Sequence, residues 1–145
     1  MKKLIVAAAM IVSLSAFAKE ERTVSPKVLN AFNTEFTTAQ EVEWTVSSDY
    51  YRADFDMNGQ KVSAYFNEDG DLMGITRNIS SAQLPVSLQN SLKKNYGNYW
   101  ISNLFEVAKN NGTSYYVTME DGDKKIVLNS TAGSDWHIFK KDRKI

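Results

Sequence analysis

Apolar residues recur along this chain first at helical spacing and then in strand-like alternation, and the same order occurs twice. In the first occurrence, Ser25 and Pro26 are typical of a helix start. Val28, Phe32 and Phe36 then recur at intervals of four, on one helical face. This stretch therefore predicts an amphipathic helix that ends near Phe36.

Alternating apolar and polar residues follow this helix, which is the pattern of half-buried strands. Val42, Trp44 and Val46 share one face of the first segment. The pair Asn58-Gly59 separates two further segments and predicts a type I′ hairpin. A turn at Asp69-Gly70 then precedes a last segment. The first occurrence thus predicts a helix followed by a four-stranded antiparallel meander.

The second occurrence begins at Pro85 and predicts a helix that ends near Tyr96, with Ser80 or Ser81 as its cap. Strands are expected at 100–109, 113–120, 123–129 and 134–140. Three pairs of residues in the two occurrences share one constant offset: Gly59 and Gly122, Lys61 and Lys124, Gly70 and Gly133. A constant offset is typical of one supersecondary unit packed against a copy of itself.

The predicted fold class is therefore α+β, a tandem duplication of a helix followed by a four-stranded antiparallel sheet. We expect the first repeat to span 19–79 and the second 80–145, packed together as one compact unit. The residues expected in the core are Phe32, Phe36, Trp44, Phe55, Phe66, Leu88 and Leu92.

Residues 1–18 have the order of a secretory signal peptide. Lys2 and Lys3 precede an apolar run from Leu4 to Leu14, and Ala16-Phe17-Ala18 supplies small residues at a cleavage site. The run is shorter than the roughly 20 residues of a membrane-spanning helix. We expect cleavage after Ala18, export to the periplasm or the medium, and no membrane insertion of the mature chain.

Charge content narrows the class of partner, and cysteine content indicates how the exported protein is stabilised. The chain has 17 basic and 17 acidic residues, and loss of Lys2 and Lys3 with the leader leaves a small acidic excess. Neither nucleic acid nor an anionic membrane surface is therefore expected as the main partner. The chain has no cysteine, so packing rather than disulfides must stabilise the exported protein.

Catalytic residues are not predicted, and neither is a cofactor. The chain has no cysteine and one histidine, His137, and it lacks a nucleophile elbow, a P-loop and a dinucleotide fingerprint. Asp54, Asp56 and Asn58 match the start of a calcium loop, but Tyr65 stands where a bidentate Glu is required. We interpret this segment as an outward-facing strand and a hairpin turn, with calcium binding as the alternative.

Aromatic residues give the remaining functional signal. Tyr50, Tyr65 and Tyr116 alternate away from the predicted core, as does Arg52. Tyr and Arg are enriched in protein interfaces and their hot spots. These four residues are the predicted partner-binding set; the alternative is that the rings cover a sheet face or fill an interface between the repeats.

The whole mature chain resembles the PepSY-like domains, also described as beta-lactamase-inhibitor-like (BLIP-like) exported bacterial proteins. The residues that carry the resemblance are Ser25-Pro26, Val42-Glu43-Trp44, Tyr51-Arg52-Ala53-Asp54-Phe55, Asn58-Gly59, Asp69-Gly70, Leu84-Pro85 and Tyr115-Tyr116. The second repeat departs from the pattern, since Asn129-Ser130-Thr131-Ala132-Gly133 replaces the acidic turn. The resemblance implies helix-plus-sheet repeats and a non-enzymatic binding or inhibitory role.

The sequence therefore predicts an exported binding module that contacts an envelope or secreted protein, with a peptidase as one candidate partner, through an exposed sheet face. Two alternatives stay open: a binder of small ligands or calcium that uses the acidic turns, and a structural envelope protein.

Overall fold

The computed structural model describes residues 23–144, and the predicted signal peptide over 1–18 lies outside them. The elements in chain order are α1 (Pro26–Glu35), β1 (Gln40–Val46), β2 (Tyr51–Met57), β3 (Gln60–Phe66), β4 (Leu72–Asn78), the short 3₁₀ helix η1 (Ser81–Gln83), α2 (Val86–Asn95), β5 (Trp100–Lys109), β6 (Gly112–Glu120), β7 (Lys124–Thr131) and β8 (His137–Arg143). Within the described part of the chain, no helix is long and apolar enough to cross a membrane.

The two α-helices begin in different ways. Ser25 caps α1 by accepting a hydrogen bond from the backbone N–H of Val28 at 3.3 Å, and Pro26 follows as the first helical residue, as the sequence predicts. Ser80 instead precedes η1, where its N–H donates to the side-chain oxygen of Gln83 at 2.8 Å. Pro85 then stands at the N-terminal cap of α2.

The strands form one eight-stranded antiparallel sheet in the order β1-β2-β3-β4-β5-β6-β7-β8. The prediction of an α+β fold, a tandem duplication of a helix followed by a four-stranded antiparallel sheet, is therefore wrong: the protein is mostly β, with one eight-stranded sheet and two short α-helices. The two halves join because β4 pairs with β5, from Ile75↔Ala108 to Asn78↔Phe105. Pairing removes two edges whose backbone N–H and C=O groups would otherwise stay open.

Both helices pack on the same face of this sheet. Under α1 the core contains Phe55, Val62 and Phe66, and under α2 it contains Leu104, Val117 and Leu128. Of the residues predicted to be buried, all are buried except Trp44, which is half-buried because β1 is an edge strand. Each half of the sheet therefore has its own apolar core.

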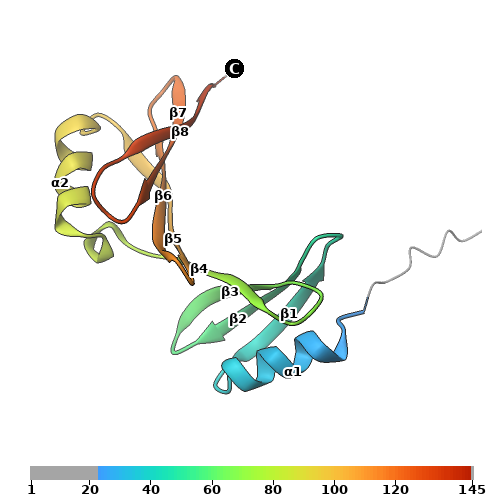
Figure 1. Cartoon of the computed structure of the whole chain (residues 1–145). Coiled ribbons are helices and arrows are strands. Elements are labelled where there is room, and N and C mark those ends of the chain that lie inside the picture. Colours follow the sequence, from blue (N-terminus) through green and yellow to red (C-terminus); the bar gives the residue numbers. More distant parts are fainter. Residues whose placement is uncertain (1–22, 145) are drawn as a thin grey trace, which may run out of the picture.

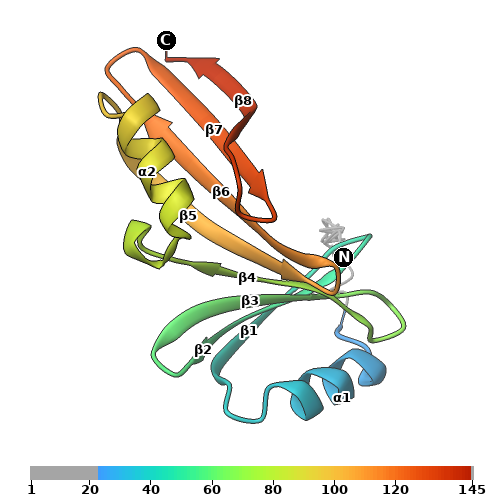
Figure 2. The same ribbon diagram turned by 60° about the vertical axis from the view of Figure 1, so that its left-hand side comes forward.

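The sheet bends where its halves meet, and the bend determines which face is free. Figures 1 and 2 show β1–β4 and β5–β8 as two arms, with α1 and α2 on the outer side of the bend. At the join, Arg77 of β4 and Glu106 of β5 form an ion pair on the helix side, and Arg77 also donates to the side-chain oxygen of Gln60 at 3.0 Å. The face opposite the helices is consequently concave, and we call it the free face.

Candidate functional site

Side chains reach the free face by simple alternation. In β3, Val62, Ala64 and Phe66 are buried beneath α1, so Ser63 and Tyr65 point the other way. Cross-strand neighbours share a face, and the pairs Arg52↔Tyr65, Asp54↔Ser63 and Ser63↔Thr76 therefore all lie on the free face. The same argument continues across the join through Thr76↔Val107.

Asp54 is held in one orientation at the centre of the β1–β4 arm. Its carboxylate accepts a hydrogen bond from Nε of Arg52 at 2.9 Å and another from the hydroxyl of Ser63. Arg52 also donates to the hydroxyl of Thr45 at 3.4 Å. These two donors fix the orientation of the carboxylate within the folded protein.

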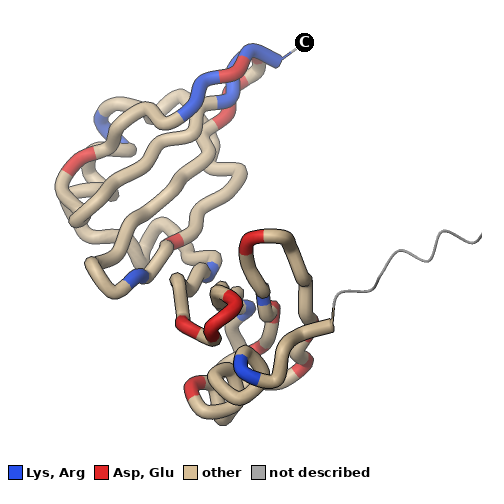
Figure 3. Tube along the Cα trace, turned by 45° about the vertical axis from the view of Figure 1, so that its right-hand side comes forward, with Lys and Arg blue, Asp and Glu red and all other residues tan. Residues whose placement is uncertain are grey.

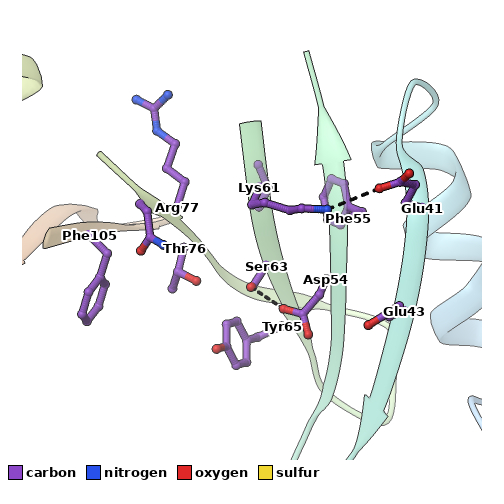
Figure 4. Close-up of a pocket in the computed structure, with 12 residues that line it drawn as sticks. Glu41, Glu43, Asp54, Phe55, Lys61, Ser63, Tyr65, Thr76, Arg77 and Phe105 are labelled. Atoms are coloured by element: carbon purple, nitrogen blue, oxygen red, sulfur yellow. Dashed lines mark hydrogen bonds and ion pairs between the residues drawn. The ribbon is translucent and has the colours of Figure 1, made fainter. Parts of the chain in front are cut away.

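A second charged group lies toward the end of the β2–β3 hairpin. Nζ of Lys61 lies 2.7 Å from the carboxylate of Asp56. It also lies 3.4 Å from the carboxylate of Glu41, a contact drawn in Figure 4. The hydrogen bond from Lys61 lowers the pKa of Asp56, and the same bond raises the pKa of Lys61. Glu43 lies in β1 opposite Asp54, and within residues 23–144 it has no ion-pair partner.

The predicted partner-binding residues all reach the free face, in two groups. Tyr50 and Tyr65 meet edge to face with ring centroids 5.5 Å apart, next to Arg52. Tyr116 lies on the other arm, stacked on Phe105 with ring centroids 5.2 Å apart. The structure thus brings three of the four residues together and places Tyr116 across the bend. Their role in binding stays a prediction.

Two aromatic residues of this face are missing from the sequence-based set. Phe105 follows the buried Leu104 in β5, so strict alternation could have assigned it to the free face. The rings of Phe139 and Tyr116 meet edge to face with their centroids 5.6 Å apart, and Phe139 is 63% exposed. The sequence does not show on which face of the sheet Phe139 lies, because the pairing of β7 with β8 shifts register between Val127 and Leu128.

The far end of the β5–β8 arm is more basic. Figure 3 shows Lys and Arg gathered near the C-terminal end of the described chain. Nζ of Lys144 lies 4.7 Å from the centre of the Trp100 ring and 2.7 Å from the carboxylate of Glu120. Hydrogen bonds from Lys144 and then Ser102 lower the pKa of Glu120. Lys144 therefore already has an aromatic and an acidic neighbour.

The calcium alternative rests on Asp54, Asp56 and Asn58. Asp54 and Asp56 pair with Arg52 and Lys61 respectively, and Asn58 lies in the hairpin turn with φ 52°. No group of three or more His, Cys, Asp or Glu side chains suited to a metal ion occurs in the described part of the chain. The one histidine, His137, is exposed at the start of β8.

Comparison with known proteins places the chain by fold. No protein-family model and no curated protein matches its sequence. A BLIP-like protein from Bacteroides fragilis matches with a TM-score of 0.72 and 18% identity, over 86% of this chain and 89% of that chain. A protein from Bacteroides eggerthii described as periplasmic matches with a TM-score of 0.73 and 17% identity, over 84% and 90% of the two chains.

A DUF2874 family protein from Bacteroides ovatus matches with a TM-score of 0.74 and 21% identity, over 84% of this chain and 89% of that chain. At such identities the shared property is the fold. These structures support the BLIP-like part of the predicted resemblance, and none of them supports its PepSY-like part. The chain therefore has a BLIP-like fold.

Proposed function

We propose that the mature protein is an exported, non-enzymatic binding module that holds an envelope or secreted protein against its concave free face. Cleavage after Ala18 would release the mature protein. A peptidase is one candidate partner, and inhibition of that partner is one outcome of binding. The proposal takes its location from the leader-like order of residues 1–18 and from the periplasmic description of the Bacteroides eggerthii protein.

One observation carries this proposal: neither helix covers the free face, although that face bears ordered aromatic rings. Phe105, Tyr116 and Phe139 form one contiguous set, and Tyr50 with Tyr65 forms another. Aromatic side chains among polar neighbours are typical of the buried centre of a protein interface. The BLIP-like fold of the Bacteroides fragilis protein supports the same interpretation.

Adjacent tyrosines supply a matched test. Tyr116 lies on the free face, whereas Tyr115 packs against the core under α2. An affinity matrix carrying residues 19–145 would isolate the partner from an envelope extract, and calorimetry would then give its dissociation constant. Tyr116→Ala, Tyr50→Ala and Tyr65→Ala should each weaken binding by about 1–3 kcal/mol.

Tyr115→Ala is the control. It should lower the melting temperature because it removes a ring from the core, yet leave the affinity of the folded protein unchanged. Equal affinity in all three free-face variants would exclude this face as the site. Turnover of a partner or small substrate by the purified protein would exclude the non-enzymatic part of the proposal.

A further inference from the structure

Two hollows adjoin on the free face and differ in chemistry. The first, of about 530 Å³, combines polar and charged groups, among them Glu43, Asp54 and Ser63, with apolar surface. The second, of about 270 Å³, has an almost wholly apolar lining that includes Tyr50, Gly74 and Val107. Tyr65 and Thr76 border both, so a single bound segment would reach the two hollows together.

Gly74, which has no side chain, lines the apolar hollow. Gly74 pairs with Tyr65 across the strands, and a side chain at position 74 would start beside the backbone oxygen of Ala108 and the aliphatic stem of Lys109, which also lines the hollow. The edge-to-face contact with Tyr50 holds the Tyr65 ring in place. Met73, 49% exposed, stands at the rim, and its flexible thioether adapts to different apolar shapes.

The polar hollow has an excess of negative charge. Three carboxylates, Glu41, Glu43 and Asp54, line this hollow together with two cations, Lys61 and Arg77. Both cations already have partners, since Lys61 pairs with Glu41 and Asp56, and Arg77 pairs with Glu106. Glu43 is exposed beside them, so the hollow favours an incoming cation.

We propose that the free face binds a protein loop that presents a large apolar side chain within two positions of a Lys or Arg. The apolar side chain enters the hollow beside Gly74, and the cation lies against Glu43 and Asp54. Residues two apart in an extended segment point to the same side, about 7 Å from each other, which suits hollows that share a border. This inference rests on the proposed function, since it names the chemistry of the partner for the same face.

A library of disulfide-closed peptide loops with randomised positions, displayed on phage and selected on residues 19–145, tests this directly. Loops that bind should be enriched in Lys or Arg within two positions of Phe, Leu, Met or Trp. Glu43→Gln should weaken the selected loops by roughly 3- to 10-fold, and this loss should shrink as salt rises. Glu68→Gln is the matched control, because Glu68 lies in the exposed turn after β3 and borders neither hollow, and it should change affinity less than twofold.

Gly74→Val probes the apolar hollow. A Cβ at position 74 would lie 3.4 Å from the backbone oxygen of Ala108, which is ordinary contact, and a thermal melt checks that the variant folds. It should weaken the selected loops by roughly tenfold or more, because an apolar anchor is displaced from its pocket. Gly122→Val, in the turn before β7 with nothing within 4 Å of its Cβ, is the control for added bulk.

The failures are distinguishable. Loops that lose affinity with Tyr65→Ala, but show no basic enrichment and no response to Glu43→Gln, would overturn this inference and leave the proposed function standing. Loops insensitive to Tyr50→Ala, Tyr65→Ala and Tyr116→Ala, or no selected loops at all, would count against both. Sedimentation showing self-association that Gly74→Val abolishes would make a second copy of this chain the occupant and overturn the inference.

Discussion

Gly70→Ala should destabilise the protein much more than Gly59→Ala, although both glycines have similar backbone angles. Gly70 has φ +84° and Gly59 has φ +77°, a region that costs other residues about 1–2 kcal/mol. Their surroundings differ: a Cβ at Gly59 meets nothing within 4 Å, whereas one at Gly70 lies 3.0 Å from the backbone oxygen of Lys27 in α1. An alanine at position 70 would therefore push the β3–β4 turn away from α1.

The expected magnitudes follow from these contacts. Gly59→Ala should lower the free energy of unfolding by about 1–2 kcal/mol through backbone strain alone. Gly70→Ala adds an overpacking cost of about 1–3 kcal/mol, for a total of about 2–5 kcal/mol. Gly133→Ala should fall between them, because at φ +70° its Cβ would lie 3.3 Å from the Pro85 ring, a side chain rather than backbone.

Urea unfolding followed by circular dichroism measures all three variants. Each should shift the midpoint with little change in the slope, since the surface exposed on unfolding is the same. If Gly70→Ala and Gly59→Ala had equal free energies of unfolding, the close approach of the turn to α1 would not contribute to stability. That result would refute the packing argument while leaving the turn geometry intact.

Two further predictions concern polar groups. Ser130 is fully buried, and among residues 23–144 its hydroxyl has no hydrogen-bond partner, so Ser130→Ala should raise the free energy of unfolding by about 1 kcal/mol; a loss of stability in the same urea assay would contradict this. Hydrogen bonds from the backbone N–H groups of Asp123 and then Lys124 lower the pKa of Asp121 from its ordinary value of 3.8. The ionised Asp121 carboxylate therefore stabilises the fold above pH 3.8, and this contribution is lost as the pH falls through the lower pKa of the folded state. Melting temperatures of Asp121→Ala and the unaltered protein should therefore differ near neutral pH and converge in acid, and a difference that persists at all pH values would exclude this cause.

Local signals in the sequence predict the elements of this fold well. Ser25-Pro26 caps and begins α1, and Asn58-Gly59 forms the β2–β3 turn with both residues at positive φ. The constant offset between Gly70 and Gly133 also has a structural reason, since each glycine lies against the start of the helix in its own half. These features depend only on neighbours in the chain or on one nearby helix.

The sequence predicts that the two halves pack together, but not which strands join them. Nothing within β4 indicates that its open edge pairs with β5, and the ion pair of Arg77 with Glu106 has meaning only after that pairing exists. The last strand was expected at 134–140 and is found at His137–Arg143, because an edge strand with one partner carries a weak alternation signal. The apolar hollow is hidden for a related reason: a missing side chain at Gly74 matters only because Tyr65 stands opposite.

Aromatic and hydrogen-bonding contacts order the free face within the folded protein, and this order bears on the affinity expected under the proposed function. Tyr65 rests against Tyr50, and Tyr116 lies between Phe105 and Phe139, so these rings have little rotamer freedom left to lose. Asp54 is likewise fixed by Arg52 and Ser63. Immobilising a free side chain on binding costs about 0.5–1.5 kcal/mol. Because these side chains are already immobilised in the folded protein, binding would not have to meet that cost again. Since the same contacts lie outside both apolar cores, substitutions that loosen them should reduce affinity more than they reduce the stability of the fold.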